Sequence, residues 1–134
     1  MTREQRKPEA ELPHVDIEML ADILSFTSVE FVVESIDEFL VAARDSLETI
    51  ADAIPREDRR VVERVAHRVR GSCGVTGAMR LSQRCAALEE AAPEASTAEL
   101  SELLARAKEE LDCVNRELGN ERRRLLGGST GGTG

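Results

Sequence analysis

His67 is the side chain in this sequence best placed for chemistry, because of the residues that follow it. Arg70 stands three residues on, and Gly71 stands four residues on. Positions three and four apart are surface neighbours on a helix, so the imidazole has a cation on one side and no side chain on the other. A free imidazole is mostly neutral near pH 7 and can act as a nucleophile. The spacing therefore suits an imidazole that is presented to a phosphoryl group and to a docking partner.

Each residue of this run also has an ordinary structural explanation, which the sequence leaves open. An exposed histidine needs no function, and Arg70 is equally well explained as a solvated arginine. A glycine inside a helix costs about 1 kcal/mol relative to alanine. Gly71 therefore indicates either access to His67, a close helix–helix contact or an early helix end. Ser72 is expected to support the helix backbone or the geometry of Arg70, or to be a small packing residue.

The helix that carries His67 is expected to bury a face away from the histidine. Its apolar residues recur at spacings of three and four, the period of a helix with one buried face. His67 falls well off this face, so we expect it to be exposed rather than a core histidine. Glu63 stands where it can pair with Arg60 or Arg64. The expected buried set is Val62, Val65, Ala66, Val69 and Cys73, and the candidate contacts for a docking partner are Arg60, Glu63, Arg64 and Arg68.

Residues with known preferences for helix ends mark the other expected boundaries. Ser, Thr and Asp favour helix starts, Pro favours the first turn, and Gly favours the end. The marks are Asp16 for a short leading helix, Thr27 with Glu30 for a long second helix, Pro55 and Gly77 for the start and end of the His67 helix, Pro93 for the end of the next, and Ser96 and Gly119 for the start and end of the last.

These elements predict an all-α protein. Short connections favour antiparallel neighbours, so we expect an up-down-up-down four-helix bundle with a short leading N-terminal helix. The bundle is expected to occupy residues 15–118. Residues 1–14, in which His14 has no expected role, and the glycine-rich segment 119–134 are expected to be flexible.

Composition argues against several classes of function. The 134 residues carry a net charge of −8, so a general nucleic-acid-binding surface is not expected. The chain has no Trp or Tyr and three Phe, so its core must be aliphatic. No stretch is long and apolar enough to span a membrane, and the first residues do not resemble a signal peptide. We therefore expect a cytoplasmic protein. Its charge is unevenly distributed, and a basic island over residues 55–72 suggests an anionic ligand.

Cys73, Cys85 and Cys113 are expected to be small buried hydrophobes. Their number is odd and their spacing is not that of a metal-ligand set, so neither a disulfide nor a metal site is expected. The chain also lacks a glycine-rich phosphate loop for ATP and an acidic cluster for Mg²⁺. It is therefore expected to be a phosphoryl carrier rather than a kinase, with no cofactor of its own.

The motif around His67 resembles the histidine-containing phosphotransfer (HPt) domain of multistep phosphorelays. The family pattern is roughly His-x-Leu-Lys-Gly-Ser, then Gly-Ala or Gly-Leu, then a helix with Leu, Cys or Ala, and Leu-Glu or Ile-Gln. Helix number and order extend the resemblance weakly over residues 15–118. The matching residues here are the run from His67 to Ser72, then Gly77-Ala78, Leu81, Cys85 and Leu88-Glu89.

The resemblance implies a role for each residue of the site. His67 is the phosphorylated residue, on the ring nitrogen farther from the backbone. Arg70 stabilises the phosphoryl charge in place of the usual lysine, and Gly71 gives the receiver access. Glu89 hydrogen-bonds the histidine ring and fixes its orientation; without the resemblance it would be read as a solvated glutamate. Arginine in place of lysine keeps the charge but changes its geometry.

The leading hypothesis is a phosphorelay intermediate. It accepts a phosphoryl group on His67 from a receiver-domain aspartate and passes it to another response regulator. The expected partners are receiver domains of a hybrid sensor histidine kinase or a response regulator, which supply Mg²⁺ and the carboxylate. A monomer is expected, because the apolar faces are consumed within the bundle. Two alternatives stay open: a non-catalytic helical protein-interaction module, and the output fragment of a larger hybrid kinase.

Overall fold

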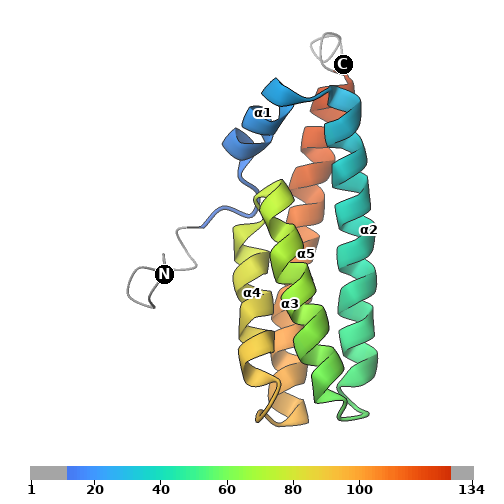
Figure 1. Cartoon of the computed structure of the whole chain (residues 1–134), viewed down its shortest axis with the longest axis vertical. Coiled ribbons are helices and arrows are strands. Elements are labelled where there is room, and N and C mark those ends of the chain that lie inside the picture. Colours follow the sequence, from blue (N-terminus) through green and yellow to red (C-terminus); the bar gives the residue numbers. More distant parts are fainter. Residues whose placement is uncertain (1–11, 128–134) are drawn as a thin grey trace.

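The structure is a computed structural model that describes residues 12–127, and every regular element within this range is a helix. The long helices lie alongside one another, and the short leading helix lies at one end of the bundle (Figure 1). The predicted all-α bundle with a short leading helix is confirmed. The helices are α1 (Ile17–Phe26), α2 (Val29–Ala53), α3 (Arg59–Thr76), α4 (Met79–Ala91) and α5 (Thr97–Leu126).

Successive long helices run in opposite directions, and each packs against the next (Figure 1). α3 contacts α2 and α4, and α5 closes the ring by contacting α4 and α2. Short connections hold such neighbours antiparallel. The helix that carries His67 therefore lies between α2 and α4, and this position decides which side chains can reach the imidazole.

The interior is mainly aliphatic, as the composition predicts, with Phe39 as an aromatic member of the core. Leu, Ile and Val residues from all four long helices form one core cluster. The five residues predicted to form the buried face of α3 are all buried. Cys73 and Cys85 are buried as well, but Cys113 is only half-buried, so the expectation of burial is wrong for that thiol.

Side-chain caps set the starts of the helices, and one differs from prediction. Asp16 and Ser96 cap α1 and α5 as expected, each accepting a hydrogen bond from a backbone N–H of the first turn. α2 is capped by Ser28 rather than Thr27. The Thr27 hydroxyl instead donates to the carbonyl of Ile23 at the end of α1. A threonine that bonds back into the preceding helix is not available to cap the following one.

α3 begins later than Pro55 predicts. Pro55 lies in a turn, and the Asp58 side chain caps the helix, whose first residue is Arg59. Such a cap contributes about 1 kcal/mol. The Arg59 guanidinium also donates to the carbonyls of Ala92 and Ala95, which fixes the start of α3 against the connection between α4 and α5.

Gly77 ends α3, as predicted, in the left-handed conformation at φ 69° that favours glycine. The chain before α1 passes close by: the backbone N–H of Asp16 donates to the carbonyl of Gly77 at 3.1 Å. A Cβ atom at Gly77 would lie 2.5 Å from Cβ of Asp16. Both the backbone angle and this close approach therefore require glycine here.

The residues just before α1 are attached to the bundle, which corrects the expectation that residues 1–14 are loose. Arg80 donates through Nε to the carbonyl of Leu12 at 2.7 Å. Nδ1 of His14 lies 2.6 Å from Oε2 of Glu110 on α5. The expectation is therefore wrong for residues 12–14, while residues 1–11 lie outside the described range.

α5 continues past Gly119 to Leu126, so the predicted helix end is wrong. An interior glycine costs about 1 kcal/mol, but contacts beyond it offset that cost. Arg122 donates to the Asp37 carboxylate of α2 at 2.9 and 3.2 Å, and Leu125 packs against the core. Residues 119–126 therefore belong to the bundle rather than to a flexible tail, and residues 128–134 lie outside the described range.

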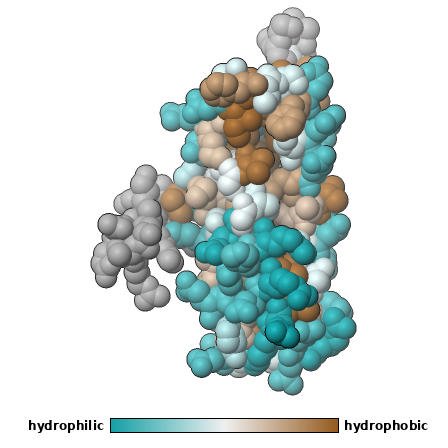
Figure 2. All heavy atoms as spheres, in the orientation of Figure 1, coloured by the Kyte–Doolittle hydropathy of each residue, from teal (hydrophilic) through white to brown (hydrophobic). Residues whose placement is uncertain are grey.

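The surface divides into a polar and a more apolar part. Figure 2 shows hydrophilic side chains over the lower half of the visible face and apolar side chains gathered around α1. Exposed apolar residues of that upper end include Ile17, Phe26 and Phe31. Within the described residues, no helix is long and apolar enough to cross a membrane.

Candidate functional site

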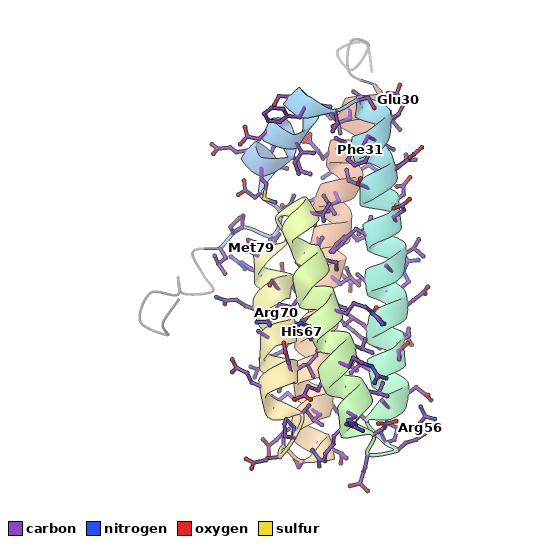
Figure 3. All side chains as sticks on the ribbon, viewed as in Figure 1. Glu30, Phe31, Arg56, His67, Arg70 and Met79 are labelled. Atoms are coloured by element: carbon purple, nitrogen blue, oxygen red, sulfur yellow. The ribbon has the colours of Figure 1, made fainter. Side chains whose placement is uncertain are left out.

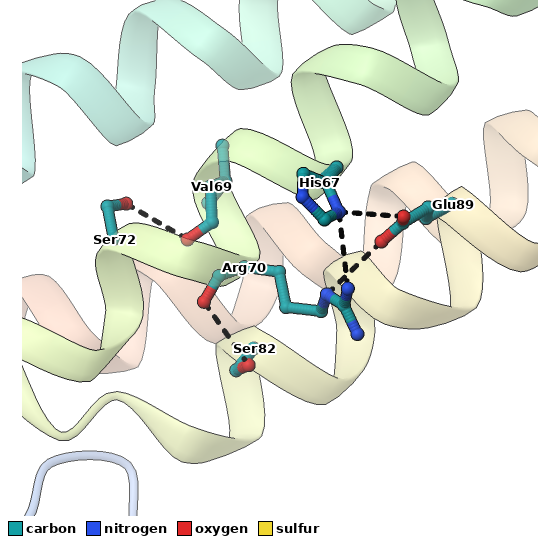
Figure 4. A network of polar contacts seen from close by, with 6 residues as sticks. All are labelled: His67, Val69, Arg70, Ser72, Ser82 and Glu89. Carbon is teal, nitrogen blue, oxygen red and sulfur yellow. Dashed lines mark hydrogen bonds and ion pairs between the residues drawn. The ribbon is translucent and has the colours of Figure 1, made fainter.

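His67 projects from the exposed face of α3 beside α4 (Figures 3 and 4). Its side chain is 64% exposed, as the apolar pattern of the helix predicts. The neighbouring residues Ala66 and Val69 are buried in the core. The imidazole is therefore exposed to solvent, while the helix that carries it is anchored by buried neighbours.

Glu89 on α4 favours one tautomer of the neutral imidazole. Its Oε2 lies 2.8 Å from Nδ1 of His67. An ionised carboxylate can only accept a hydrogen bond, so Nδ1 is the nitrogen that carries the proton. Nε2, the ring nitrogen farther from the backbone, then has the free lone pair. Within residues 12–127, Nε2 has no hydrogen-bond or ion-pair partner.

Arg70, one turn after His67, contacts both members of this pair. Its Nε lies 3.1 Å from Oε1 of Glu89, an ion pair without hydrogen-bond geometry. Its Nη2 lies 3.2 Å from Nδ1 of His67. A protonated Nδ1 cannot accept a hydrogen bond from a guanidinium. In this tautomer the second contact is therefore a close approach and not a hydrogen bond. With 42% of its side chain exposed, Arg70 has room to turn towards a group attached to His67.

Gly71 leaves open space beside His67. α3 continues to Thr76, which excludes an early helix end. A Cβ atom at Gly71 would meet nothing within 4 Å, which excludes a close helix–helix contact and also any crowding of His67 by a methyl group. Of the explanations that the sequence left open, the approach of a partner is the one that the geometry retains.

Ser72 bonds to its own helix rather than to Arg70. Its hydroxyl donates to the carbonyl of Val69 at 2.9 Å (Figure 4). A bond of this kind joins a side chain to its own helix and does not orient a neighbouring guanidinium. The alternative in which Ser72 sets the geometry of Arg70 is therefore not what the structure shows.

The candidate docking residues on α3 all lie on the surface. Arg60, Glu63, Arg64 and Arg68 are exposed. Within the described range, Glu63 forms no ion pair with Arg60 or Arg64. Arg60, Arg64 and Arg68 stand four residues apart, so they follow one side of the helix. We call these three residues the arginine stripe.

Sequence reasoning missed one residue of the site. Ser82 on α4 places its hydroxyl 3.5 Å from the carbonyl of Arg70, a long and weak hydrogen bond (Figure 4). The signal was its spacing: Ser82 precedes Glu89 by seven residues, two helical turns, and so shares its face. α4 therefore contacts α3 through polar groups at two levels, at Glu89 and at Ser82.

Comparison with known protein families gives one family. The Hpt domain matches residues 34–118, a range that contains α3, α4 and every residue of the site. The match spans more than half of the chain, so the chain belongs to the Hpt domain family. Its members are phosphocarrier modules of phosphorelays rather than kinases, and they interact with receiver domains.

A solved structure agrees with the fold. The crystal structure of histidine-containing phosphotransfer protein B (HptB) from Pseudomonas aeruginosa PAO1 aligns with a TM-score of 0.77 and 24% identity. The alignment covers 84% of this chain and 96% of that chain. At this identity the likeness shows a shared fold alone. The search of curated proteins gave no match.

Proposed function

We propose that His67 accepts a phosphoryl group from the aspartyl phosphate of one receiver domain and passes it to the aspartate of another. The observation that carries this proposal is the bond between Nδ1 of His67 and Glu89 at 2.8 Å, on an imidazole that is 64% exposed. It leaves the lone pair on Nε2. A nucleophile with a fixed tautomer and an open approach is what attack on a phosphoryl group requires.

The transfer step uses that lone pair. Nε2 forms a bond to phosphorus, the bond between phosphorus and the aspartate oxygen breaks, and the carboxylate leaves with the electron pair. The proton on Nδ1 stays on the ring, so the phosphorylated imidazole is formally cationic. The Glu89 carboxylate at Nδ1 stabilises that positive charge. The reverse sequence delivers the phosphoryl group to the next receiver.

Arg70 is proposed to hold the transferred group. In the resting site its guanidinium lies against Glu89, 3.1 Å from Oε1. A phosphoryl group on Nε2 brings negative oxygens, which a guanidinium binds through forked hydrogen bonds. Gly71 leaves room for the receiver to approach, and the Ser72 hydroxyl stays out of the way because it is bonded to the carbonyl of Val69. No cofactor of this chain takes part, and the Mg²⁺ belongs to the receiver.

The arginine stripe and its neighbour Glu63 are proposed to guide docking of the receiver. The three arginines are exposed on the helix that carries His67, on a chain of net charge −8. A local basic surface of this kind attracts an acidic pocket and raises the rate of association at low salt. We expect the chain to act as a monomer in this role, which sedimentation equilibrium measures.

The test is phosphotransfer from purified, phosphorylated receiver domains with Mg²⁺. The full chain, His67→Gln and His14→Gln are each mixed with the receivers, and acid-labile, alkali-stable phosphate on the chain is followed. His14 is the matched control, since the chain has two histidines. We expect label on wild type and His14→Gln and none on His67→Gln. Onward loss of the label to a second receiver establishes the relay.

The alternative function is a helical interaction module that binds a receiver without chemistry. It predicts binding that His67→Gln leaves intact, with no label on any of the three proteins. Binding with label confined to the chains that retain His67 excludes it. Absence of label with every functional receiver of the source organism overturns the carrier proposal.

A further inference from the structure

Three potential metal ligands meet away from the phosphotransfer site. His14 precedes α1, and Glu110 and Cys113 lie three residues apart on α5, so the latter two share a face. One ligand atom from each residue can be chosen so that all three atoms lie within 4.8 Å of one another. None of these three residues belongs to the network of His67, Arg70 and Glu89.

The cluster is built into the fold rather than assembled on a mobile surface. The Glu110 side chain is only 4% exposed, and its Oε2 lies 2.6 Å from Nδ1 of His14. Hydrogen bonds attach the chain to the bundle both before and after His14. Arg80 donates to the carbonyl of Leu12, and the N–H of Asp16 donates to the carbonyl of Gly77.

We infer that His14, Glu110 and Cys113 form a binding site for a divalent transition-metal ion, with Zn²⁺ as the ion that fits best. The sequence spacing gave no sign of this site. An imidazole nitrogen, a carboxylate oxygen and a thiolate are the three donor types that Zn²⁺ accepts. Ca²⁺ and Mg²⁺ prefer all-oxygen sets, so the thiolate and imidazole disfavour them. Water completes the tetrahedron as the fourth ligand.

The distances allow this with side-chain adjustment alone. Zinc bonds of about 2.0–2.3 Å in a tetrahedron separate neighbouring ligand atoms by roughly 3.3–3.6 Å. The His14–Glu110 pair at 2.6 Å must open slightly, and the widest separation, at most 4.8 Å, must close. Arg116, which donates through Nη2 to Sγ of Cys113 at 3.4 Å, is exposed and can turn away.

Binding is balanced in protons. The Cys113 thiol releases its proton to solvent, and His14 carries its remaining proton on Nε2 so that Nδ1 can donate its lone pair to the ion. The bound ion replaces the direct contact between His14 and Glu110. Its consequence is structural: it links the segment before α1 to α5. The folded chain is stabilised by an amount that grows with the logarithm of the free Zn²⁺ concentration once this exceeds the dissociation constant.

The experiment measures metal binding by the full chain, freed of metal with a chelator. Zn²⁺ is titrated in competition with a chromophoric chelator, and Co²⁺ is added separately to record its absorption. We expect one Zn²⁺ per chain, and for Co²⁺ the thiolate-to-cobalt charge-transfer band with the intense visible bands of tetrahedral coordination. Cys113→Ser and His14→Gln should each weaken Zn²⁺ binding at least about tenfold and make the rise in Tm at a given Zn²⁺ concentration smaller than in wild type.

The matched control is His67→Gln, which removes the other histidine and should leave metal binding unchanged. Glu110→Gln alters a buried carboxylate and can disturb folding, so the test relies on the two more exposed ligands. The proposal is overturned if Zn²⁺ binds with equal affinity to wild type, Cys113→Ser and His14→Gln. It is also overturned if binding is lost in His67→Gln or if the Co²⁺ complex shows no thiolate band; His14 and Glu110 then form an ion pair only.

Discussion

The two nitrogens of the His67 ring are placed in different surroundings, and the proposed phosphotransfer depends on this difference. Nδ1 lies 2.8 Å from Glu89 on the neighbouring helix, whereas Nε2 has no partner within the described residues. A hydrogen bond at one ring nitrogen sets the tautomer and thereby the basicity of the other. The proposed reactivity of His67 therefore depends on a residue of α4.

Replacing Glu89 tests this dependence. A hydrogen bond to a charged group contributes about 1.5–3 kcal/mol, so Glu89→Ala should slow phosphorylation of His67 by roughly 10–100-fold. Glu89→Gln keeps an oxygen that accepts from Nδ1 but loses the charge, so its rate of phosphorylation should lie between those of wild type and Glu89→Ala. The initial rate of label transfer from a phosphorylated receiver measures both. Glu90→Ala, next to it and exposed, is the control; equal rates for all four proteins would refute the role of Glu89.

Gly71→Ala should affect the stability of the chain and the access of the receiver to His67 in opposite directions. The added Cβ meets nothing within 4 Å, and alanine is the better helix former, so the free energy of unfolding should rise by about 0.5–1 kcal/mol. Transfer from the receiver should nevertheless become slower, because the methyl group occupies the space proposed for the partner.

Urea denaturation and transfer rates measure the two effects of Gly71→Ala. Gly74→Ala, at another exposed helix position with open space, is the matched control for the gain in stability and should slow transfer less. Unchanged transfer in Gly71→Ala would remove the access role from this glycine.

At the scale of elements, the two glycines that were predicted to end a helix behave in opposite ways. Gly77 ends α3 with a positive φ and lies against Asp16, whereas Gly119 lies inside α5, where an added Cβ would make only an ordinary contact with Arg123 at 3.7 Å. Whether a glycine ends a helix or lies inside it can therefore be decided only when the contacts of the residues that follow it are known.

Matched alanine substitutions test this difference. Gly119→Ala should raise the free energy of unfolding by about 0.5–1 kcal/mol, because it removes an interior helical glycine. Gly77→Ala should lower it by at least about 1 kcal/mol, since a left-handed alanine is strained and its Cβ meets Asp16 at 2.5 Å. Urea denaturation of both variants measures the changes. A loss of stability in Gly119→Ala would mean that α5 ends there.

At the scale of the whole molecule, the bundle is closed by an aliphatic core that includes two thiols. Burial raises the pKa of Cys85 to about 12, and burial together with the nearby Cys85 raises the pKa of Cys73 further. A thiol whose pKa is higher in the folded chain stabilises that chain below the unfolded pKa. This stabilisation is lost as the pH rises towards the folded pKa.

Stability should therefore fall on the alkaline side. The ordinary thiol pKa is 9.0, so from about pH 9 each buried thiol should remove about 1.4 kcal/mol of unfolding free energy per pH unit. The chain has no tyrosine to obscure the effect. Cys85→Ala should make the slope shallower, whatever its constant packing cost, and Cys113→Ser, at a half-buried thiol, should change it less. Urea denaturation between pH 8 and about 11 measures the slopes, and a flat profile would contradict the prediction.

The sequence alone determined several features that depend on neighbours along a single helix. The apolar spacing of Val62, Val65 and Val69 placed His67 on the exposed side of α3, and Asp16 and Ser96 marked two helix starts. These features follow from helical periodicity and from local hydrogen bonds, which a chain carries in its residue order. The relation between His67 and Glu89 came from the family resemblance, since their separation of 22 residues has no local meaning.

Only the tertiary structure decided which side chains from different elements meet. It brought Glu89 to Nδ1 of His67, carried α5 past Gly119 through the contact between Arg122 and Asp37, and joined His14 to Glu110. Each of these depends on the rotation and register of packed helices, which are set by the fit of the whole core rather than by any local pattern. Local patterns in the sequence could thus predict the exposure of His67, but not its contact with Glu89 or the meeting of His14 with Glu110 and Cys113.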